Sequence, residues 1–225
     1  PLTPQGQTSD PDELCDGQTA AVLIQNPNYF GCVENLTAAA DAAHKHGALL
    51  VACATEALSL GMLKSPGAQG ADIFVAEGQS FGLPPCFGGP LLGIMAVRKE
   101  LLRRMPGRLV GQTVDRRGNT GYVLTLAARE QHIRREKATS NICTNESLMA
   151  LRAAIYLCAL GPRGLREVAR LNLLKARYAK ERIAAIPGFR MAFSAPVFNE
   201  FTVLTPRPAP QILQQLRSQN IHGGI

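Results

Sequence analysis

Polar side chains and glycines gather between residues 77 and 90, directly after an apolar stretch. Gln79 and Ser80 lie there, and a Gly-Gly-Pro sequence follows. Ligands of open α/β sheets bind at the carboxyl ends of strands, and glycine lets the backbone approach a ligand closely. Glycine clusters are equally common in ordinary tight turns. The segment by itself therefore leaves a binding loop and a plain connection between strands both open.

A second segment with binding chemistry runs from residue 129 to 145. Arg134 lies in its cationic first part, and Thr139, Ser140 and Asn141 come shortly before a stretch with helical spacing. Hydroxyls and amides at a helix N-terminus, beside arginines, suit a phosphate or a carboxylate. The same pattern fits an ordinary N-cap next to a solvated charged face. Both interpretations stay open.

The positive charge of the chain is concentrated in one stretch. The whole chain has a net charge of +7, and residues 98–137 hold eleven Lys/Arg against four Asp/Glu, while the remainder is balanced. Segment 103–118 within it is basic and rich in turn residues, which fits an exposed docking loop or a solvated connection. With 5% aromatic residues and no Trp, few platforms exist for stacking bases, so nucleic acid is disfavoured. An anionic cofactor or an acidic protein partner fits better.

Other chemistries find little support in the sequence. The six cysteines form no CxxC pair and do not cluster with the four histidines, so we expect reduced thiols and no metal site. His44 and His46 precede Gly47, which favours a role in capping a helix C-terminus. No Ser/His/Asp set or carboxylate pair stands out. Without a long apolar run or an export signal, we expect a soluble, cytoplasmic protein with no membrane partner.

The spacing of apolar residues predicts an α/β fold. Short apolar stretches at 20–25, 48–54, 71–76 and 91–97 fit buried strands, and residues 35–46 fit a helix that stops at a glycine. Buried strands that alternate with helices or long connections are typical of a sheet covered on both faces. We therefore expect a three-layer α/β domain.

The pattern changes after residue 145. Helical spacing at 145–160 and 163–186, each ending at a Gly/Pro pair, predicts two long helices, followed by a strand at 197–204 and a helix at 210–218. This order predicts that residues 1–161 are part of a large domain and that 162–225 begin a small α+β domain. Since the chain starts without Met and ends on a Gly-Gly-Ile, we expect a fragment of a longer protein.

Three blocks in register resemble the P-protein family of the glycine cleavage system, in its first half or separate α subunit. The similarity begins at Ala20–Gly31 and is most specific at Gly78–Ser80 with Phe87–Pro90, at Pro106–Gly111 and at Arg134–Thr144. The resemblance implies the aspartate-aminotransferase-like fold, fold type I of the enzymes that depend on pyridoxal phosphate (PLP). This fold agrees with the α/β pattern.

The resemblance also exposes a missing residue. Catalytic members of the fold hold PLP through a lysine, usually near the turn that here reads Gln79-Ser80-Phe81, and no lysine lies between Lys64 and Lys99. In the preceding strand, only Glu56 is available in place of the aspartate that usually pairs with the pyridine nitrogen. The resemblance therefore implies that a lysine-bearing β subunit, or a C-terminal half, supplies the lysine and the cofactor, and that the isolated chain is inactive.

The activity implied by the resemblance is glycine decarboxylation with PLP, followed by transfer of the aminomethyl group to the lipoyl arm of the H-protein. Gln79, Ser80, Arg134 and the Thr139–Asn141 loop are then expected to line a shared site or its channel, and residues 98–137 to form a basic rim for an acidic H-protein. Two alternatives remain: a non-catalytic subunit that stabilises its partner, and another fold type I PLP enzyme, such as a desulfurase-like one.

Overall fold

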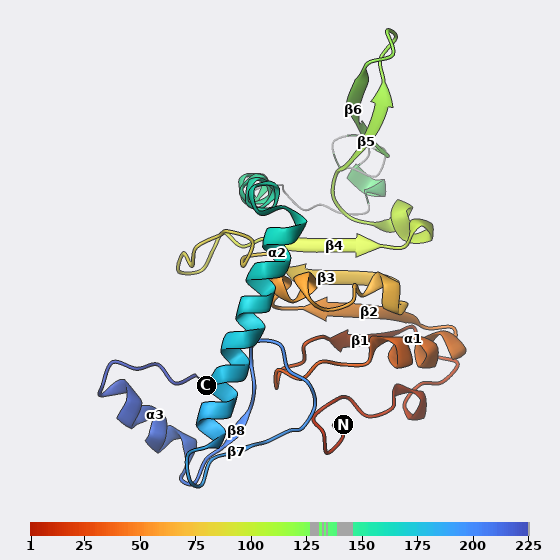
Figure 1. Cartoon of the computed structure of the whole chain (residues 1–225). Coiled ribbons are helices and arrows are strands. Elements are labelled where there is room, and N and C mark those ends of the chain that lie inside the picture. The colour runs from red at the N-terminus through yellow and green to blue at the C-terminus, as the bar shows by residue number, and fades with distance from the viewer. Residues whose placement is uncertain (127–130, 132, 134, 139–145, 225) are drawn as a thin grey trace.

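A four-stranded sheet forms the centre of the computed structural model (Figure 1). The structure describes residues 1–224 except 127–130, 132, 134 and 139–145. Strands β1 (Ala21–Gln25), β2 (Leu49–Ala54) and β3 (Ile73–Glu77) are parallel, and β4 (Gly93–Val97) runs antiparallel beside β3, so that the order in the sheet is β1-β2-β3-β4. All four lie within two residues of the predicted stretches, and these predictions are confirmed.

Helix α1 (Leu36–Lys45) covers one face of this sheet. The Asn35 side chain accepts a hydrogen bond from the Ala38 amide at 3.1 Å and so caps the first turn. Small residues of α1 pack with Leu50 and Ala52 of β2 in one core cluster. On the opposite face Leu23 of β1 is 74% exposed, so within the described residues this face is partly open.

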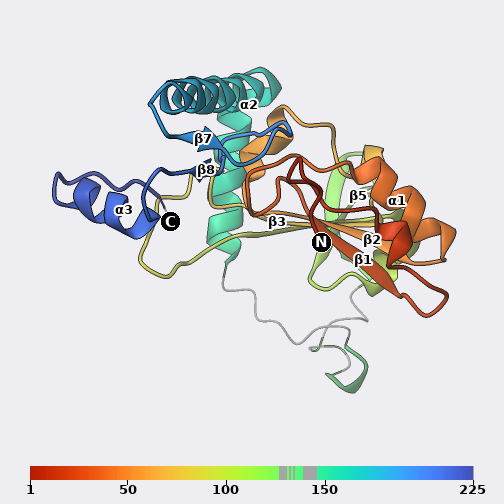
Figure 2. The ribbon, with the colours of Figure 1, turned by 90° about the horizontal axis from the view of Figure 1, so that it is seen from below.

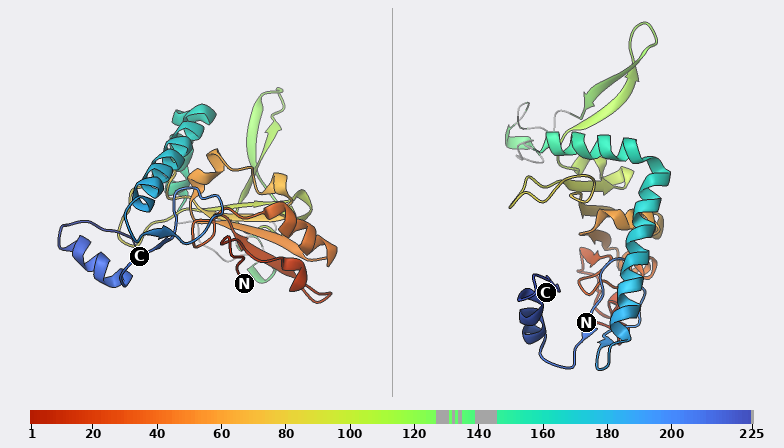
Figure 3. Two further views of the ribbon diagram at one scale, coloured as in Figure 1. Left: turned by 60° about the horizontal axis from the view of Figure 1, so that its bottom comes forward. Right: turned by 60° about the vertical axis from the view of Figure 1, so that its left-hand side comes forward.

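The segment labelled α2 (Ser147–Ala184) consists of two helices that meet at a sharp bend, and the prediction of two helices is confirmed (Figure 3). Gly161 has φ 61° and ψ 179°, a conformation that is essentially restricted to glycine, and Pro162 opens the second half. The predicted stop is thus a bend without a loop, because proline is tolerated in the first turn of a helix. The predicted domain division at residue 161 falls at this bend and stays a prediction.

A second core cluster joins α2 to the carboxyl end of the sheet. Ala153 and Ala169 of α2 pack with Leu58 of the short 3-10 helix η2 (Ala57–Gly61) and with Phe81. Further short 3-10 helices are η1 (Pro11–Glu13), η3 (Gly67–Gln69), η4 (Lys99–Arg104) and η6 (Arg135–Lys137).

The C-terminal region first turns back beside the second half of α2, and its last helix then lies away from α2 (Figure 2). It contains β7 (Arg190–Met191), paired with β8 (Val203–Leu204), and helix α3 (Ala209–Arg217). The helix predicted at 210–218 is confirmed. The strand predicted at 197–204 is wrong over most of its length, because only its last two residues pair in a ladder while Val197 makes a single bridge to Cys32.

A β-hairpin projects from the body of the molecule beyond β4 (Figure 1). Its strands are β5 (Leu109–Val114) and β6 (Thr120–Thr125), paired over six residues each. The Asp115 carboxylate closes the turn by accepting hydrogen bonds from the amides of Arg117 (2.7 Å) and Asn119 (2.9 Å). The sequence predicted a loop here, so the two strands are a correction to that prediction.

Candidate functional site

The parallel strands β1, β2 and β3 all end at one edge of the sheet, and candidate residues follow β3 there. The Glu77 carboxylate accepts hydrogen bonds from the amides of Gln79 (2.9 Å) and Leu92 (3.3 Å), which holds both ends of the segment between β3 and β4. Gln79 and Ser80 are therefore placed at the carboxyl edge of the sheet, where the sequence predicted them.

The hydroxyl of Ser80 is buried and has no hydrogen-bond partner among the described residues. Its neighbour Phe81 lies in the second core cluster, so the turn cannot easily rotate to solvate the hydroxyl. A buried hydroxyl without a partner costs free energy unless a further group reaches it. The other candidates, Arg134, Thr139, Ser140 and Asn141, lie outside the described residues, so their position relative to Ser80 remains a prediction.

A buried polar network follows β1 at the same edge of the sheet. The Glu34 carboxylate, which is buried, accepts hydrogen bonds from Asn28 Nδ2 (2.7 Å), from the Thr8 amide (2.9 Å) and from Thr8 Oγ1 (3.0 Å). The Glu34 amide in turn donates to Asn26 Oδ1 at 2.9 Å. The sequence analysis missed this network, although the Asn26-Pro27-Asn28 turn was a usable signal. It ties the N-terminal segment to the start of α1.

A cavity of about 260 Å³ borders this network. Its wall includes Gln7, Thr8, Glu34 and Asn35. Because both carboxylate oxygens of Glu34 already accept hydrogen bonds within the chain, the network serves to fix the N-terminal segment.

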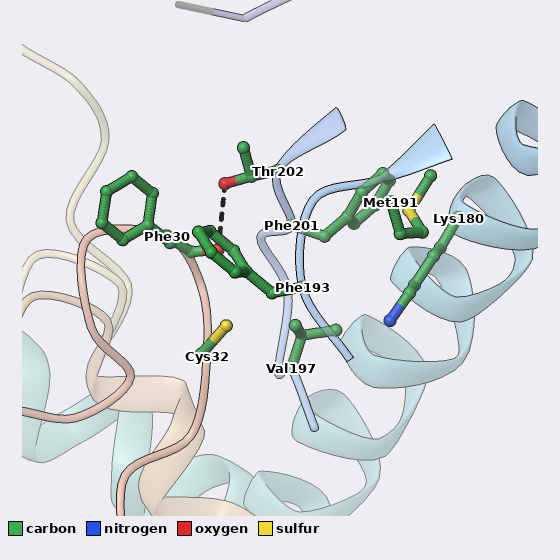
Figure 4. Close-up of a pocket in the computed structure, with 8 residues that line it drawn as sticks. All are labelled: Phe30, Cys32, Lys180, Met191, Phe193, Val197, Phe201 and Thr202. Atoms are coloured by element: carbon green, nitrogen blue, oxygen red, sulfur yellow. Dashed lines mark hydrogen bonds between the residues drawn. The ribbon is translucent and has the colours of Figure 1, made fainter. Parts of the chain in front are cut away.

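A tighter pocket lies where Phe30 meets side chains of the C-terminal region (Figure 4). Phe193 packs edge-on against Phe30 with ring centroids 5.2 Å apart, and Thr202 Oγ1 donates to the Phe30 carbonyl at 3.3 Å. The space does not admit a water molecule. Burial raises the pKa of the Cys32 thiol in its wall, which disfavours the reactive thiolate. This contact therefore joins two segments of the chain and offers no ligand site.

Charged groups at the opposite edge of the sheet hold neighbouring elements of the fold together. Asp72 accepts from His44 Nε2 and from the Leu50 amide, both at 2.8 Å, and pairs with Arg98 at 2.8 Å. His46 occupies the C-cap position of α1, as predicted, while its ring pairs with Asp12 at 2.7 Å. The His44 side chain thus links α1 to β3, a role that the sequence analysis did not foresee.

The described residues hold no group of three His, Cys, Asp or Glu side chains placed to bind a metal ion.

Comparison with known proteins decides the family. The sequence model of the glycine cleavage system P-protein matches residues 4–223. The chain belongs to this P-protein family. The probable glycine dehydrogenase (decarboxylating) subunit 1 of Desulforamulus reducens is 55% identical over 220 residues, which are 97% of this chain and 49% of that protein. The corresponding subunit 1 of Chlorobium luteolum is 53% identical over 94% of this chain and 47% of that protein.

Solved structures agree with this membership. A crystal structure of a P-protein, glycine decarboxylase of the glycine cleavage system in inhibitor-bound form, superposes with a TM-score of 0.91 at 48% identity, over 99% of this chain and 50% of that chain. A NifS-like protein superposes with a TM-score of 0.64 at 16% identity, over 99% of this chain and 54% of that chain, which shows a shared fold alone. The expected PLP fold type I is confirmed. The chain spans about half the length of the curated relatives it matches.

The described residues at the carboxyl edge do not fit covalently bound PLP. A Schiff base needs a lysine amine, and the turn after β3 presents the amide of Gln79 and the buried hydroxyl of Ser80 instead, with no lysine between Lys64 and Lys99. Family membership implies PLP-dependent chemistry.

Proposed function

We propose that this chain is part of the lysine-free subunit, or of the corresponding N-terminal half, of glycine dehydrogenase (decarboxylating). The observation that carries the proposal is the Gln79-Ser80 turn at the end of β3, in a chain whose relatives at 50% identity or more are named subunit 1. A subunit 1 implies a companion subunit. We assign to that companion the lysine and the PLP, and to the complex the decarboxylation of glycine in the cytoplasm.

Bound PLP supplies the electron sink that glycine decarboxylation needs. The residues of this chain have other tasks. Ser80 and Gln79, at the end of β3, line the shared site or the channel that leads to it, together with Arg134 and the Thr139–Asn141 loop. The buried hydroxyl of Ser80, which lacks a partner among the described residues, supports this role because such a group gains most from contact with a ligand or a second chain.

The aminomethyl group is then passed to the lipoyl arm of the H-protein. We assign the basic rim for this carrier to residues 98–137, and among its described cations Arg103 and Arg104 are exposed on η4. A cationic rim attracts an acidic carrier from a distance and raises its association rate. Salt should therefore weaken the apparent affinity for H-protein.

The experiment uses the complete subunit, purified with and without its lysine-bearing companion. We expect exchange of the glycine carboxyl group with bicarbonate only when both subunits are present. The isolated subunit, mixed with PLP, should show no Schiff-base absorption that borohydride can fix. If it does show that absorption, a self-sufficient PLP enzyme replaces the proposal.

A Ser80→Ala variant tests the role of the turn. In the complex we expect kcat to fall roughly tenfold, while Ser65→Ala, an exposed serine in a loop, leaves kcat unchanged. Unchanged kinetics in Ser80→Ala, together with wild-type assembly, would favour the alternative of a subunit that only stabilises its partner.

A further inference from the structure

Segment 78–83, the Ser80 turn, follows β3 and is closed by two backbone hydrogen bonds. The amides of Phe81 and Leu83 donate, each at 3.0 Å, to the carbonyls of the residues three and four positions earlier. Both hydrogen-bonded rings enclose Ser80. The position of the buried Ser80 hydroxyl therefore depends on where this turn as a whole is held.

The start of the Ser80 turn is held by the segment that leads into β4. The Gly78 amide donates to the Leu92 carbonyl at 2.6 Å. A methyl group on Gly78 would lie 3.0 Å from Cδ2 of Leu92 and 3.2 Å from Cδ1 of Ile94, so the packing leaves little free space there. Phe81 and Leu83 are buried in the second core cluster. The turn is therefore fixed at its start and along its inner face.

The end of the Ser80 turn is held by α2, through the side chain of Tyr156. A methyl group on Gly82 would lie 2.8 Å from Cγ and Cδ2 of Tyr156 and 2.9 Å from its Cβ, closer than a real Cβ approaches another carbon. Gly82 also has a φ of 82°, which glycine adopts without strain. The tyrosine ring thus occupies the space where a side chain at position 82 would lie, and it limits how far the turn can move toward α2.

Tyr156 is itself anchored in the core. Its partly buried ring packs against the second core cluster, which contains Phe81 of the turn and Ala153 of the same helix. Residues three apart lie on one side of a helix, so the buried Ala153 directs Tyr156 toward the sheet as well. Rotation of the ring away from the turn would expose apolar surface. The ring is therefore a fixed wall for the Ser80 turn.

We infer that Tyr156 is a positioning residue for glycine decarboxylation: its ring holds the Ser80 turn in place and so sets where the Ser80 hydroxyl stands. This inference rests on the proposed function, which assigns Ser80 to the shared site. The Ser80 hydroxyl is buried without a partner among the described residues, and a hydrogen bond to a ligand weakens steeply when its geometry is poor. A small displacement of the turn therefore lowers the rate although every polar group of the turn is retained.

Variants of Tyr156 in the complete subunit, assembled with its companion, test this role. Tyr156→Ala removes the ring, and kcat at saturating glycine should fall about threefold to tenfold. Tyr156→Phe retains Cβ, Cγ and Cδ2, the atoms nearest to a Cβ at Gly82, and should have wild-type kcat. Tyr178→Ala is the matched control, because Tyr178 is a 65% exposed tyrosine in the second half of α2, and it should also have wild-type kcat. Equal kcat of Tyr156→Ala and wild type would overturn the inference.

A double-mutant cycle separates a positioning role from a general loss of stability. If Tyr156 acts through Ser80, Tyr156→Ala should lower kcat by less than about 1.5-fold when Ser80→Ala is already present. An equal loss in both backgrounds would show that the ring acts elsewhere, which overturns the inference.

Hydrogen exchange in the free subunit tests the hold on the turn without an activity assay. The amides of Phe81 and Leu83 should exchange about tenfold faster in Tyr156→Ala than in wild type, and at the wild-type rate in Tyr156→Phe. The Leu50 amide in β2, which donates to Asp72, reports on the rest of the fold and should change less. If all three amides accelerate by the same factor, or if none does, the ring does not hold this turn in particular and the inference is wrong.

The two experiments also separate this inference from the proposed function. If the wild-type complex does not exchange the glycine carboxyl group, the proposed activity is refuted, and hydrogen exchange still tests whether Tyr156 holds the turn. If Ser80→Ala lowers kcat and Tyr156→Ala does not, only the role of Tyr156 is refuted.

Discussion

Nε2 of His44 lies 2.8 Å from Oδ2 of Asp72, a carboxylate with 4% exposure that also binds the Leu50 amide and Arg98. One side chain thereby joins the end of α1, the start of β2, the start of β3 and the residue after β4. Such a carboxylate stabilises the sheet because its loss would leave the buried Leu50 amide without this acceptor.

We expect Asp72→Asn to lower the free energy of unfolding of the complete subunit by about 1–3 kcal/mol. The NH2 group of the new amide would face another hydrogen-bond donor, either the Leu50 N–H or the Arg98 guanidinium, and could not accept a hydrogen bond from it. Urea denaturation measures the change. Asp41→Asn, at an exposed position of α1, is the control and should change stability by less than about 0.5 kcal/mol. Equal effects of the two variants would contradict a structural role for Asp72.

The contribution of Asp72 should depend on pH. Burial raises the pKa of Asp72, but hydrogen bonds from His44 and Leu50 and the charges of His44 and Arg98 outweigh it, and the net pKa lies below the ordinary 3.8. A carboxyl with a lowered folded pKa contributes stability above its unfolded pKa and loses it as the pH falls through the folded one. The stability gap between wild type and Asp72→Asn should therefore be full at pH 7 and shrink below about pH 4. A gap that grows on acidification would contradict this cause.

Glu34→Gln should release the N-terminal segment. The substituted amide can accept only at one oxygen, and its NH2 group would face the Thr8 amide or Asn28 Nδ2. We expect a loss of about 1–3 kcal/mol of stability and faster hydrogen exchange at Thr8. The exposed Glu13 provides the control, Glu13→Gln. Slow exchange at Thr8 in Glu34→Gln would show that other contacts hold the segment.

Gly31→Ala should weaken the contact between the Asn28–Cys32 turn and the C-terminal region. Gly31 has φ 82°, and a Cβ there would overlap the carbonyl of Glu200. Since backbone cannot move aside like a flexible side chain, we expect a loss of about 2 kcal/mol or more. Gly67→Ala is the control, because no atom lies within 4 Å of a Cβ at that position. Thermal unfolding of both variants checks the prediction.

The core of the fold could be predicted from the sequence because buried parallel strands consist of continuous runs of apolar residues. Stretches such as Leu49–Ala54 contain hardly any polar residue, and α1 ends at a glycine. The β5–β6 hairpin was missed for the opposite reason. Its strands contain Gly111, Gln112 and Gly121, its apolar residues face solvent, and the flanking arginines dominate the pattern.

Long-range contacts explain what the sequence could not predict in the site and in the C-terminal region. The partners of Glu34 include Thr8, 26 residues away, and no local pattern indicates that pairing. Strands β7 and β8 have two residues each, too short for any alternation to be recognised. Gln79 and Ser80 were predicted to lie at the carboxyl edge of the sheet because they directly follow a strand, and the same rule would have indicated Asn26.

The bend at Gly161 gives helix α2 two separate attachments. Its second half runs beside β7 of the C-terminal region, whereas its first half exposes Leu148, Leu151 and Ile155. The angle between the two halves thus depends on the φ and ψ of Gly161 as well as on the packing of Ala153 and Ala169 in the core. A mutation at Gly161 would therefore change the orientation of this surface relative to the rest of the molecule. The residues that make up the surface would stay the same.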